Sequence, residues 1–387
     1  MKILRRLALL FAVLLTACTF SFPDAPAGTP TPKDAPAKPT VKKAPTRTPK
    51  KTPGKAPTRS PKKTPGKVPT RSPNRAPVDS PGGRLGVTGV TLWVFPDDGV
   101  DPLVEMITSA KTRVWLTIYM LSEVRIFDAL KTAKDNGIDV RVLIEPSPLG
   151  GASSAKAALS RLKRDNIEVK TANPAFRLTH EKSYVIDNEM VILTSNMTRS
   201  SFTRNREFAV VHRDPQDVDE LVRAFNADWN REEFVPQSPN LVWSPDNSRV
   251  RIDALIEGAQ KTLEVYAAST LDDEQLGLLA QAQKRGVKVR LITSPRAPEG
   301  EDPAASDLDN LQRARVKVRY IKVPLIHAKA FIADFSEPSM LGFVGSINIT
   351  AQSLDFNREL GILLADEDAL TRIHDTFEQD WSKSTDR

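Results

Sequence analysis

From residue 85 onward, short apolar runs alternate with amphipathic stretches along the chain. β-Branched and aromatic residues in these runs predict strands at residues 113–119, 138–144, 183–186, 191–194 and 208–211. Apolar residues spaced three and four apart predict helices at residues 101–111, 125–136, 154–164 and 217–229. This alternation of strands and helices indicates a layered α/β architecture.

The same order of elements recurs in the second half of the chain. It predicts strands at residues 263–268, 287–293, 316–321, 328–333 and 360–364, and helices at 273–285, 306–313 and 368–381. Three turn residues recur 149 positions later, since Pro96, Gly137 and Pro146 match Pro245, Gly286 and Pro295. A constant offset of this kind indicates two copies of one structural plan. We predict two lobes, at residues 85–235 and 236–387, each long enough to bury a core.

The first 17 residues have the pattern of a secretory signal. Lys2, Arg5 and Arg6 precede an apolar run at residues 7–15 that is too short to span a bilayer. The following Leu-Thr-Ala-Cys resembles the lipobox of bacterial lipoproteins, which implies that Cys18 becomes the lipidated first residue. A conventional signal with an incidental cysteine is the alternative. Cys18 is the only cysteine in the chain, so an intramolecular disulfide is excluded.

Residues 18–84 are expected to form a disordered tether. Proline occupies every fourth position from Pro45 to Pro81, and residues 23–84 carry 15 Lys and Arg against 3 Asp. Residues 85–387 instead hold 37 basic and 45 acidic residues, so the basic balance belongs to the tether. A basic tether favours contact with anionic lipid or cell-wall polymers. A merely solvated linker is the alternative.

Two copies of one polar motif occur in the predicted lobes. They read His180-x-Lys182-x4-Asp187 and His327-x-Lys329-x4-Asp334, and they use two of only four histidines. Each copy is followed by a hydroxyl residue, an asparagine and a glutamate, namely Thr194, Asn196 and Glu207 in the first and Ser346, Asn348 and Glu359 in the second. The asparagine precedes the glutamate by eleven residues in both copies. This repetition indicates a duplicated half of an active site.

These residue types suit the cleavage of a phosphodiester, which needs charge neutralisation, a nucleophile and an acid. In a strand, a histidine and a lysine two residues apart lie on the same face. The side chains expected to donate hydrogen bonds to the phosphate are Asn196, Asn348, Thr194 and Ser346. Glu207 and Glu359 are suited to accept from a histidine ring nitrogen. We interpret Asp187 and Asp334, at the strand ends, as structural.

The motifs resemble those of the phospholipase D superfamily. The resemblance implies a mixed sheet flanked by helices in each lobe (an α/β/α sandwich), a pseudo-two-fold axis between the lobes, and one shared site. It also implies a phosphohistidine intermediate, with His180 as nucleophile, His327 as acid and base, and Lys182 and Lys329 supplying positive charge. No cluster with metal-ligand spacing is evident, so we expect no metal and no cofactor.

The first copy departs from the family pattern at one position. Four other histidine and tryptophan residues are expected to have structural roles and no role in catalysis. Leu193 stands where the second copy has Gly345, which predicts a restricted backbone beside the phosphate. His212 and His374 are expected to be surface or packing residues, and Trp229 and Trp381 to pack in the core or between the lobes. The loops at residues 147–153 and 295–305 follow equivalent strands and are candidates for the rim of the pocket.

Three classes of phosphodiester chemistry fit this pattern. The first is hydrolysis of glycerophospholipid to phosphatidic acid and free headgroup, which suits a lipoprotein at a membrane. The second is phosphatidyl transfer of the cardiolipin-synthase type, and the third is a non-specific, metal-independent endonuclease, which a body with net charge −8 disfavours. A non-catalytic binding protein is a fourth option, disfavoured because both histidines are present. We expect a monomer in the cell envelope, anchored through Cys18 on the periplasmic or extracellular face.

Overall fold

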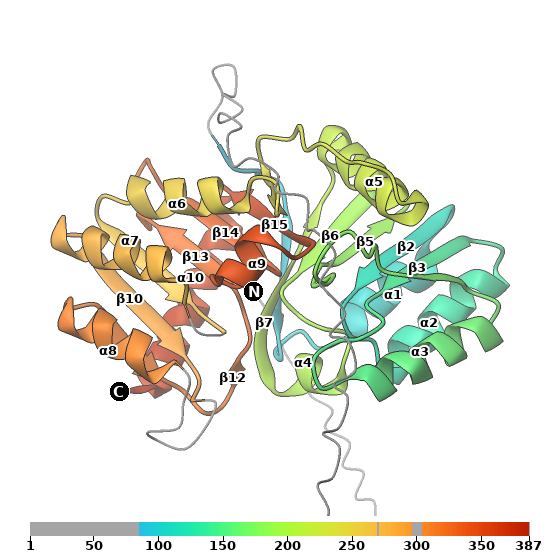
Figure 1. The fold of residues 1–387 in the computed structure, drawn as a ribbon, viewed down its shortest axis with the longest axis horizontal. Helices are drawn as coiled ribbons and strands as arrows, with labels where there is room; N and C mark the ends of the chain where they lie inside the picture. The colour runs from blue at the N-terminus through green and yellow to red at the C-terminus, as the bar shows by residue number, and fades with distance from the viewer. Residues whose placement is uncertain (1–84, 269–270, 296–303, 387) are drawn as a thin grey trace, which may run out of the picture. The chain divides into compact units, whose positions relative to one another are not determined.

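The two halves of the repeat fold around two eight-stranded sheets in the computed structural model, which describes residues 85–268, 271–295 and 304–386 (Figure 1). The predicted signal, Cys18 and the tether lie outside the described residues. The prediction of two homologous lobes with mixed sheets is confirmed.

The first sheet combines three parallel strands with antiparallel neighbours. Its order is β1 (Thr91–Phe95), β7 (Asn205–His212), β6 (Glu189–Leu193), β5 (Lys182–Ile186), β2 (Arg113–Ile118), β3 (Asp139–Ile144) and β4 (Glu168–Thr171). The pairs β2–β3 and β3–β4 are parallel, and the remaining pairs along this order are antiparallel.

The second sheet repeats this order, strand for strand, and adds one short strand at its edge. It runs β8 (Leu241–Ser244), β15 (Glu359–Leu364), β14 (Leu341–Gly345), β13 (Ala330–Ala333), β9 (Thr262–Tyr266), β10 (Lys288–Thr293), β11 (Lys317–Tyr320) and β16 (Thr385–Asp386). A further strand, β12 (Leu325–Ile326), belongs to the second half of the chain but pairs in parallel with β7 of the first. The two sheets are therefore joined by backbone hydrogen bonds as well as by side chains.

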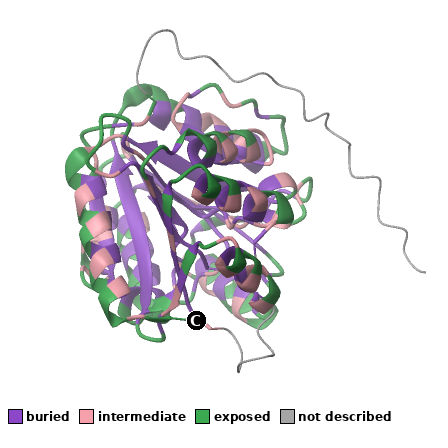
Figure 2. Cartoon of the chain, turned by 90° about the vertical axis from the view of Figure 1, so that its left-hand side faces the viewer, coloured by how far each residue is buried: buried purple, intermediate pink, exposed green. Residues whose placement is uncertain are grey.

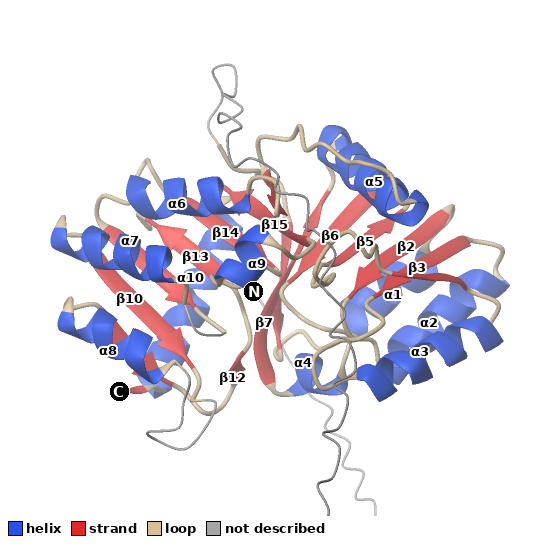
Figure 3. Ribbon diagram, in the orientation of Figure 1, coloured by secondary structure: helices blue, strands red, loops and turns tan. Residues whose placement is uncertain are grey.

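Helices cover the outer face of each sheet (Figure 3). These are α1 (Asp101–Ser109), α2 (Val124–Asp135), α3 (Ala152–Arg164) and α4 (Arg199–Thr203) in the first lobe, and α6 (Ser248–Gly258), α7 (Asp273–Lys284), α8 (Ala305–Arg313) and α9 (Ala351–Asp355) in the second. Two longer helices, α5 (Pro215–Asn230) and α10 (Glu367–Lys383), pack instead into the core between the lobes. Within the described residues, no helix is both long and apolar enough to cross a membrane.

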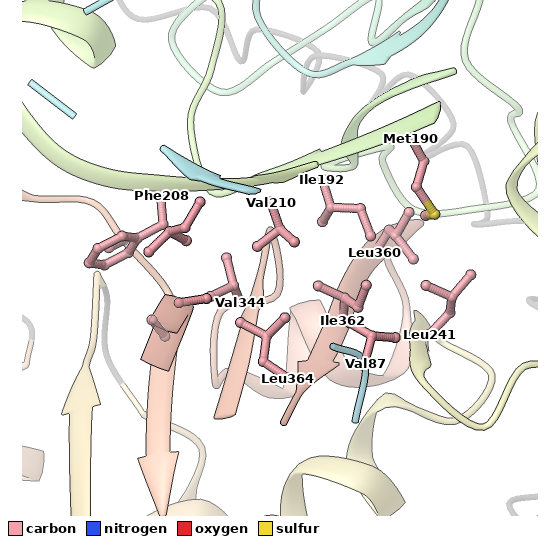
Figure 4. Packing of buried hydrophobic residues seen from close by; sticks show 14 of the residues in the cluster. Val87, Met190, Ile192, Phe208, Val210, Leu241, Val344, Leu360, Ile362 and Leu364 are labelled. Atoms are coloured by element: carbon pink, nitrogen blue, oxygen red, sulfur yellow. The ribbon is translucent and has the colours of Figure 1, made fainter. Parts of the chain in front are cut away.

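The apolar side chains form three cores, one beneath the outer helices of each lobe and one between the lobes. In the central core, Ile192, Phe208 and Val210 of the first sheet face Val344 and Leu360 of the second (Figure 4). Fully burying one such side chain contributes about 1.5–3 kcal/mol. Figure 2 shows that the strands are buried while the helices expose one face, as an amphipathic pattern requires.

The predicted helices agree with the observed ones to within a few residues, but α4, α6 and α9 were not predicted, and several strands were missed as well. β1 and β8 occupy the same edge of their respective sheets and are only five and four residues long. β14 is also absent from the prediction, because two glycines in Leu-Gly-Phe-Val-Gly weaken the strand pattern. β1 and β8 are too short for a period of two residues to be recognised in the sequence.

Two buried arginines connect the lobes symmetrically. Arg206 on β7 donates from Nε to Asp380 on α10 at 2.8 Å, and Arg358, just before β15, donates from Nε to Asp228 on α5 at 2.8 Å. Asp380 also accepts a hydrogen bond from Tyr266. Each arginine therefore binds the closing helix of the opposite lobe.

Asp380→Ala is expected to lower the free energy of unfolding by about 3 kcal/mol, because it removes one partner of a buried ion pair. Among the described residues, the Arg206 guanidinium would keep Asp97 and the Phe95 carbonyl as partners. Chemical denaturation of the full chain measures the change.

The matched control is Asp219→Ala, which removes the exposed partner of Arg223 on α5. It should change the free energy by less than about 0.5 kcal/mol. Equal losses in the two variants would contradict a specific contribution from the cross-lobe pair.

Candidate functional site

The two histidine motifs lie where each lobe is docked on the other. β5 begins at Lys182 and β13 at Ala330, so both histidines lie just before their strands, and the alternation of a strand does not set the direction of their side chains. The backbone N–H groups of His180 and Glu181 both donate to the Arg358 carbonyl at 2.9 Å. Those of His327 and the residue after it donate to the Arg206 carbonyl in the same way. The opposite lobe therefore fixes each segment.

Each histidine is paired with the glutamate of the other lobe. His180 Nδ1 lies 2.8 Å from Glu359 Oε2, and His327 Nδ1 lies 2.7 Å from Glu207 Oε1. Both glutamates are fully buried, whereas the histidine side chains are 12% and 22% exposed. An ionised carboxylate accepts from the Nδ1–H group, which leaves a lone pair on Nε2 of each imidazole.

Neighbouring polar side chains hold the glutamates in place. Thr194 donates its hydroxyl hydrogen to Glu207 Oε2 at 2.7 Å. In the second lobe, Asn357 donates to Glu359 Oε1 at 3.0 Å. The sequence analysis did not single out Asn357 or its counterpart Asn205, although both belong to the repeated Asn-Arg-Glu triplet.

The two motif lysines are buried beside the histidines. Lys182 Nζ donates to the His180 carbonyl at 2.6 Å, and Lys329 Nζ donates to the His327 carbonyl at 2.5 Å. Burial, together with the positive charge of Lys329, holds the pKa of Lys182 well below its usual value. An anion bound beside the two lysines favours their protonated forms.

Burial also sets the protonation of the histidines. It lowers the pKa of His180 to about 4 and lowers that of His327, although the facing glutamates oppose the shift. Burial raises the pKa of Glu207 and Glu359, but the paired histidines and the lysines outweigh it and the net shift is downward. At neutral pH each pair is therefore a neutral imidazole hydrogen-bonded to a carboxylate.

The residues expected to contact the phosphate fall into two groups. Asn196 and Asn348 are partly exposed, and the Asn196 Oδ1 atom is buried without a hydrogen-bond partner. Thr194 and Ser346 are fully buried. The Thr194 hydroxyl is bound to Glu207, and the Ser346 hydroxyl pairs with the Leu360 backbone. In this arrangement both hydroxyls support β7 and β15 and do not face the space beside the histidines.

Asp187 and Asp334 close the turn that follows each motif strand. Both adopt a left-handed backbone conformation, with φ of 51° and 54°. The Asp187 carboxylate accepts from the backbone N–H groups of residues 111–113, and Asp334 accepts from those of residues 260–262. Burial raises the pKa of these carboxylates, but the N–H donors outweigh it and lower them overall.

Leu193 does not crowd the motif residues. Its side chain lies in the core beneath the outer helices of the first lobe. At the equivalent site of the second lobe, a Cβ on Gly345 would lie 2.4 Å from the Gly361 Cα, so only glycine fits. The glycine therefore serves close strand packing, and the expected restriction beside the phosphate is not found.

One aromatic side chain near the motifs was missed by the sequence analysis. The Tyr119 ring packs edge-on against His180, with centroids 4.7 Å apart, and lies 5.2 Å from Lys182 Nζ. Its hydroxyl accepts from the Leu149 N–H at 2.6 Å. Ala268 holds the equivalent position in the second lobe. The lack of a repeat counterpart explains why Tyr119 gave no signal.

The buried acid groups on α5 and α10 were also missed, although a signal was present. Asp228-Trp229 and Asp380-Trp381 repeat with the same 152-residue offset as the asparagines. Trp229 is buried, and Trp381 packs against the central core, in agreement with the expected packing role. His212 is likewise a buried packing residue, hydrogen-bonded to Asp217.

The structure brings together one cluster with metal-type ligands away from the motifs. In the described part of the chain, Glu264, His374 and Glu378 place ligand atoms within 4.8 Å of one another. Arg290 already donates to both carboxylates at 2.5 Å, and the His374 ring stacks on Phe335. The cluster contains no motif residue.

A shallow surface hollow of about 300 Å³ lies between β1 and α1, lined by Trp93 and Met106, and it also contains no motif residue. The groups able to act on a phosphodiester are therefore those of the two motifs. They comprise two neutral imidazoles oriented by carboxylates, two buried ammonium groups and two partly exposed amides.

Comparison with known proteins places this arrangement in a family. The family model "Cardiolipin synthase, PLD-like domain" matches residues 103–229 and again residues 252–381. A cardiolipin synthase A of Pseudomonas aeruginosa is 30% identical over 158 residues, 40% of this chain and 32% of the relative. A cardiolipin synthase 1 of Staphylococcus epidermidis is 22% identical over 306 residues, 67% and 60% of the respective chains. This chain thus spans about a third to three fifths of these relatives.

Among solved structures, a polyphosphate kinase from Porphyromonas gingivalis shares the fold. Its TM-score is 0.62 at 17% identity, over 77% of this chain and 48% of that one. Two matches to one family model, one on each lobe, carry the assignment. The chain belongs to the phospholipase D superfamily of enzymes that act on phosphodiester bonds, as a two-repeat member of the cardiolipin synthase, phospholipase D-like domain family.

Proposed function

We propose that this protein transfers a phosphatidyl group from one phospholipid to the hydroxyl of another alcohol, in the manner of a cardiolipin synthase. The observation that carries the proposal is the pair of cross-lobe histidine–glutamate contacts in a chain matched twice by that family model. The names of the curated relatives favour transfer over the hydrolysis that the sequence analysis put first.

The first half-reaction forms a phosphohistidine. We assign His180 as the nucleophile: its Nε2 attacks phosphorus while Glu359 holds the Nδ1 hydrogen. When the anionic diester binds, it favours uptake of a proton from solvent at His327 Nε2, and Glu207 stabilises the resulting imidazolium. His327 Nε2 then gives this proton to the departing alkoxide. Lys182 and Lys329 bind the phosphoryl oxygens, with Asn196 and Asn348 as further donors.

The second half-reaction reverses these roles. His327, now neutral, removes the proton from the incoming alcohol, whose oxygen attacks phosphorus and releases His180. With a second phosphatidylglycerol as acceptor the products are cardiolipin and glycerol. Water in place of the alcohol gives phosphatidic acid, which is the hydrolysis alternative. The choice between them depends on which hydroxyl reaches the phosphohistidine first.

The location of the protein belongs to the same proposal. Lipidation at Cys18, a tether through residue 84 and a monomeric body would place the site at the envelope membrane, beside its phospholipid substrate. The basic tether would add attraction to anionic lipid.

Mass spectrometry of lipid products tests the proposed reaction. The full chain incubated with phosphatidylglycerol vesicles should yield a species with two phosphatidyl groups and an equal amount of glycerol. His180→Ala is the matched control and should yield neither. Phosphatidic acid alone would assign hydrolysis, and nicking of plasmid DNA without any lipid product would assign nuclease activity.

The pH dependence of kcat/KM tests the histidine roles with a soluble diester such as bis(p-nitrophenyl) phosphate. The nucleophile must be neutral, so activity is lost as the pH falls through the pKa of His180, well below 6.5. Glu359 raises that pKa, so Glu359→Gln should move the acidic limb to still lower pH. Glu207 raises the pKa of His327, so Glu207→Gln should move the basic limb to lower pH.

Both variants are also expected to lose activity, by about 10²- to 10⁴-fold, because the imidazoles lose their orienting charge. The two substitutions serve as controls for each other, since each glutamate is buried to the same extent. If Glu359→Gln moved the basic limb of the pH profile and Glu207→Gln moved the acidic limb, the roles of His180 and His327 would be exchanged.

A further inference from the structure

Four exposed cations lie next to the two histidine segments. Arg177 donates its backbone N–H to the Phe356 carbonyl, three residues before His180. On the other side, the Arg204 carbonyl accepts from the Leu325 N–H, two residues before His327. Lys322 precedes that segment, and Arg199 begins α4 shortly after Asn196; all four side chains are exposed. Among the described residues, none of the four has an ion-pair partner.

The pseudo-symmetry shows that the fold does not require these charges. At the offsets of the motif itself, the counterparts of Arg177, Arg199, Arg204 and Lys322 are Pro324, Ala351, Phe356 and Ala175. Each position carries an uncharged residue in the other lobe. The cations are therefore a feature of the surface around the site, in a body whose net charge is −8.

Exposed apolar side chains accompany the cations. Val323 is 80% exposed, and Leu325 and Phe356 are each 43% exposed. Leu149, at 90% exposure, extends from the loop whose backbone binds Tyr119, the residue packed on His180. Large apolar side chains this exposed beside unpaired cations indicate a surface that is covered during function.

We infer that these residues form a docking surface for an anionic phospholipid bilayer, with Arg177, Arg199, Arg204 and Lys322 on the headgroups and Val323 and Leu149 inserted between them. The inference rests on the proposed function. It identifies the substrate as lipid drawn from a bilayer and not as dispersed molecules. Cations with adjacent aliphatic side chains are the composition that binds anionic membrane interfaces.

A nucleic acid would also attract the cations, but it fits the rest of the surface less well. Binding to single strands uses aromatic side chains on which bases stack, whereas three of the four exposed apolar residues here are aliphatic. The aliphatic side chains gain nothing from a phosphate backbone, but they gain burial in a bilayer.

A charge-matched pair of variants tests the electrostatic part. In the full chain, Arg177, Arg199, Arg204 and Lys322 are all changed to serine in one variant. The control changes Lys163, Arg164, Lys284 and Lys288 to serine. These residues are also exposed, but they lie where α3 and α7 end and β10 begins, at the edge opposite the loops that carry Leu149. Both variants keep the tether and lose the same total charge.

Binding to vesicles of phosphatidylglycerol and phosphatidylcholine is measured by cosedimentation. Each cation near an anionic bilayer strengthens binding about fivefold. Because four cations are removed, the first variant should lose about 600-fold in affinity, and the control should stay within about threefold of the unchanged chain. Thermal unfolding of both variants checks that they fold.

A fluorescent probe tests insertion directly, because the chain has only one cysteine. Cys18→Ser combined with Val323→Cys allows an environment-sensitive dye to be placed at the surface, and Lys163→Cys provides the control position. The dye at residue 323 should shift to the blue on anionic vesicles, while the dye at residue 163 should not.

The outcomes separate this inference from the proposed function. Equal vesicle binding by the two serine variants, or no shift at residue 323, would overturn the docking surface even if phosphatidyl transfer is observed. If vesicle binding depends on the four cations but no lipid product forms, the docking surface is supported and the proposed reaction is refuted. Loss of plasmid binding with unchanged vesicle binding would assign the surface to nucleic acid.

Discussion

The exchange of backbone and side-chain contacts between the lobes is the constraint on which the site depends. The Arg358 carbonyl accepts hydrogen bonds from the backbone N–H groups of His180 and Glu181, while the Arg358 guanidinium binds Asp228 on α5. Arg206 does the same for the second motif and α10. Each histidine is thus placed by the strand that also carries its glutamate. A lobe alone would contain a histidine without its carboxylate and a carboxylate without its histidine.

This exchange also makes the burial of so many ionisable groups tolerable. Lys182, Lys329, Glu207 and Glu359 are nearly inaccessible to water, and each would be costly to bury without partners. The two carboxylates offset the two ammonium groups, and the histidines remain neutral. A phosphodiester that binds the lysines brings negative charge next to them. Because the lysines are already in place, they stabilise this charge without the reorientation of water that the reaction in solution requires.

The sequence predicted much of what repeats, although the repeated Asp228 and Asp380 were missed, and it did not reveal contacts between the lobes. The paired motifs, the lobes and most helices follow from spacing and periodicity, which are local properties of the chain. The pairing of His180 with Glu359, 179 residues away, depends on the relation between lobes and leaves no local trace. Tyr119 has no counterpart in the second lobe, and Thr194 serves Glu207 because a fully buried hydroxyl must find an acceptor inside the protein. Short edge strands such as β1 contain too few residues for the alternation of apolar and polar positions to be recognised.

The most direct test of a single site built by both lobes is the turnover of the histidine variants with a soluble phosphodiester. His180→Ala and His327→Ala should each reduce kcat by several orders of magnitude. The double variant should be scarcely slower than either one, because the two groups act as a unit. About half of the activity remaining in each single variant, with complete loss only in the double, would mean two independent sites and would contradict the shared active site.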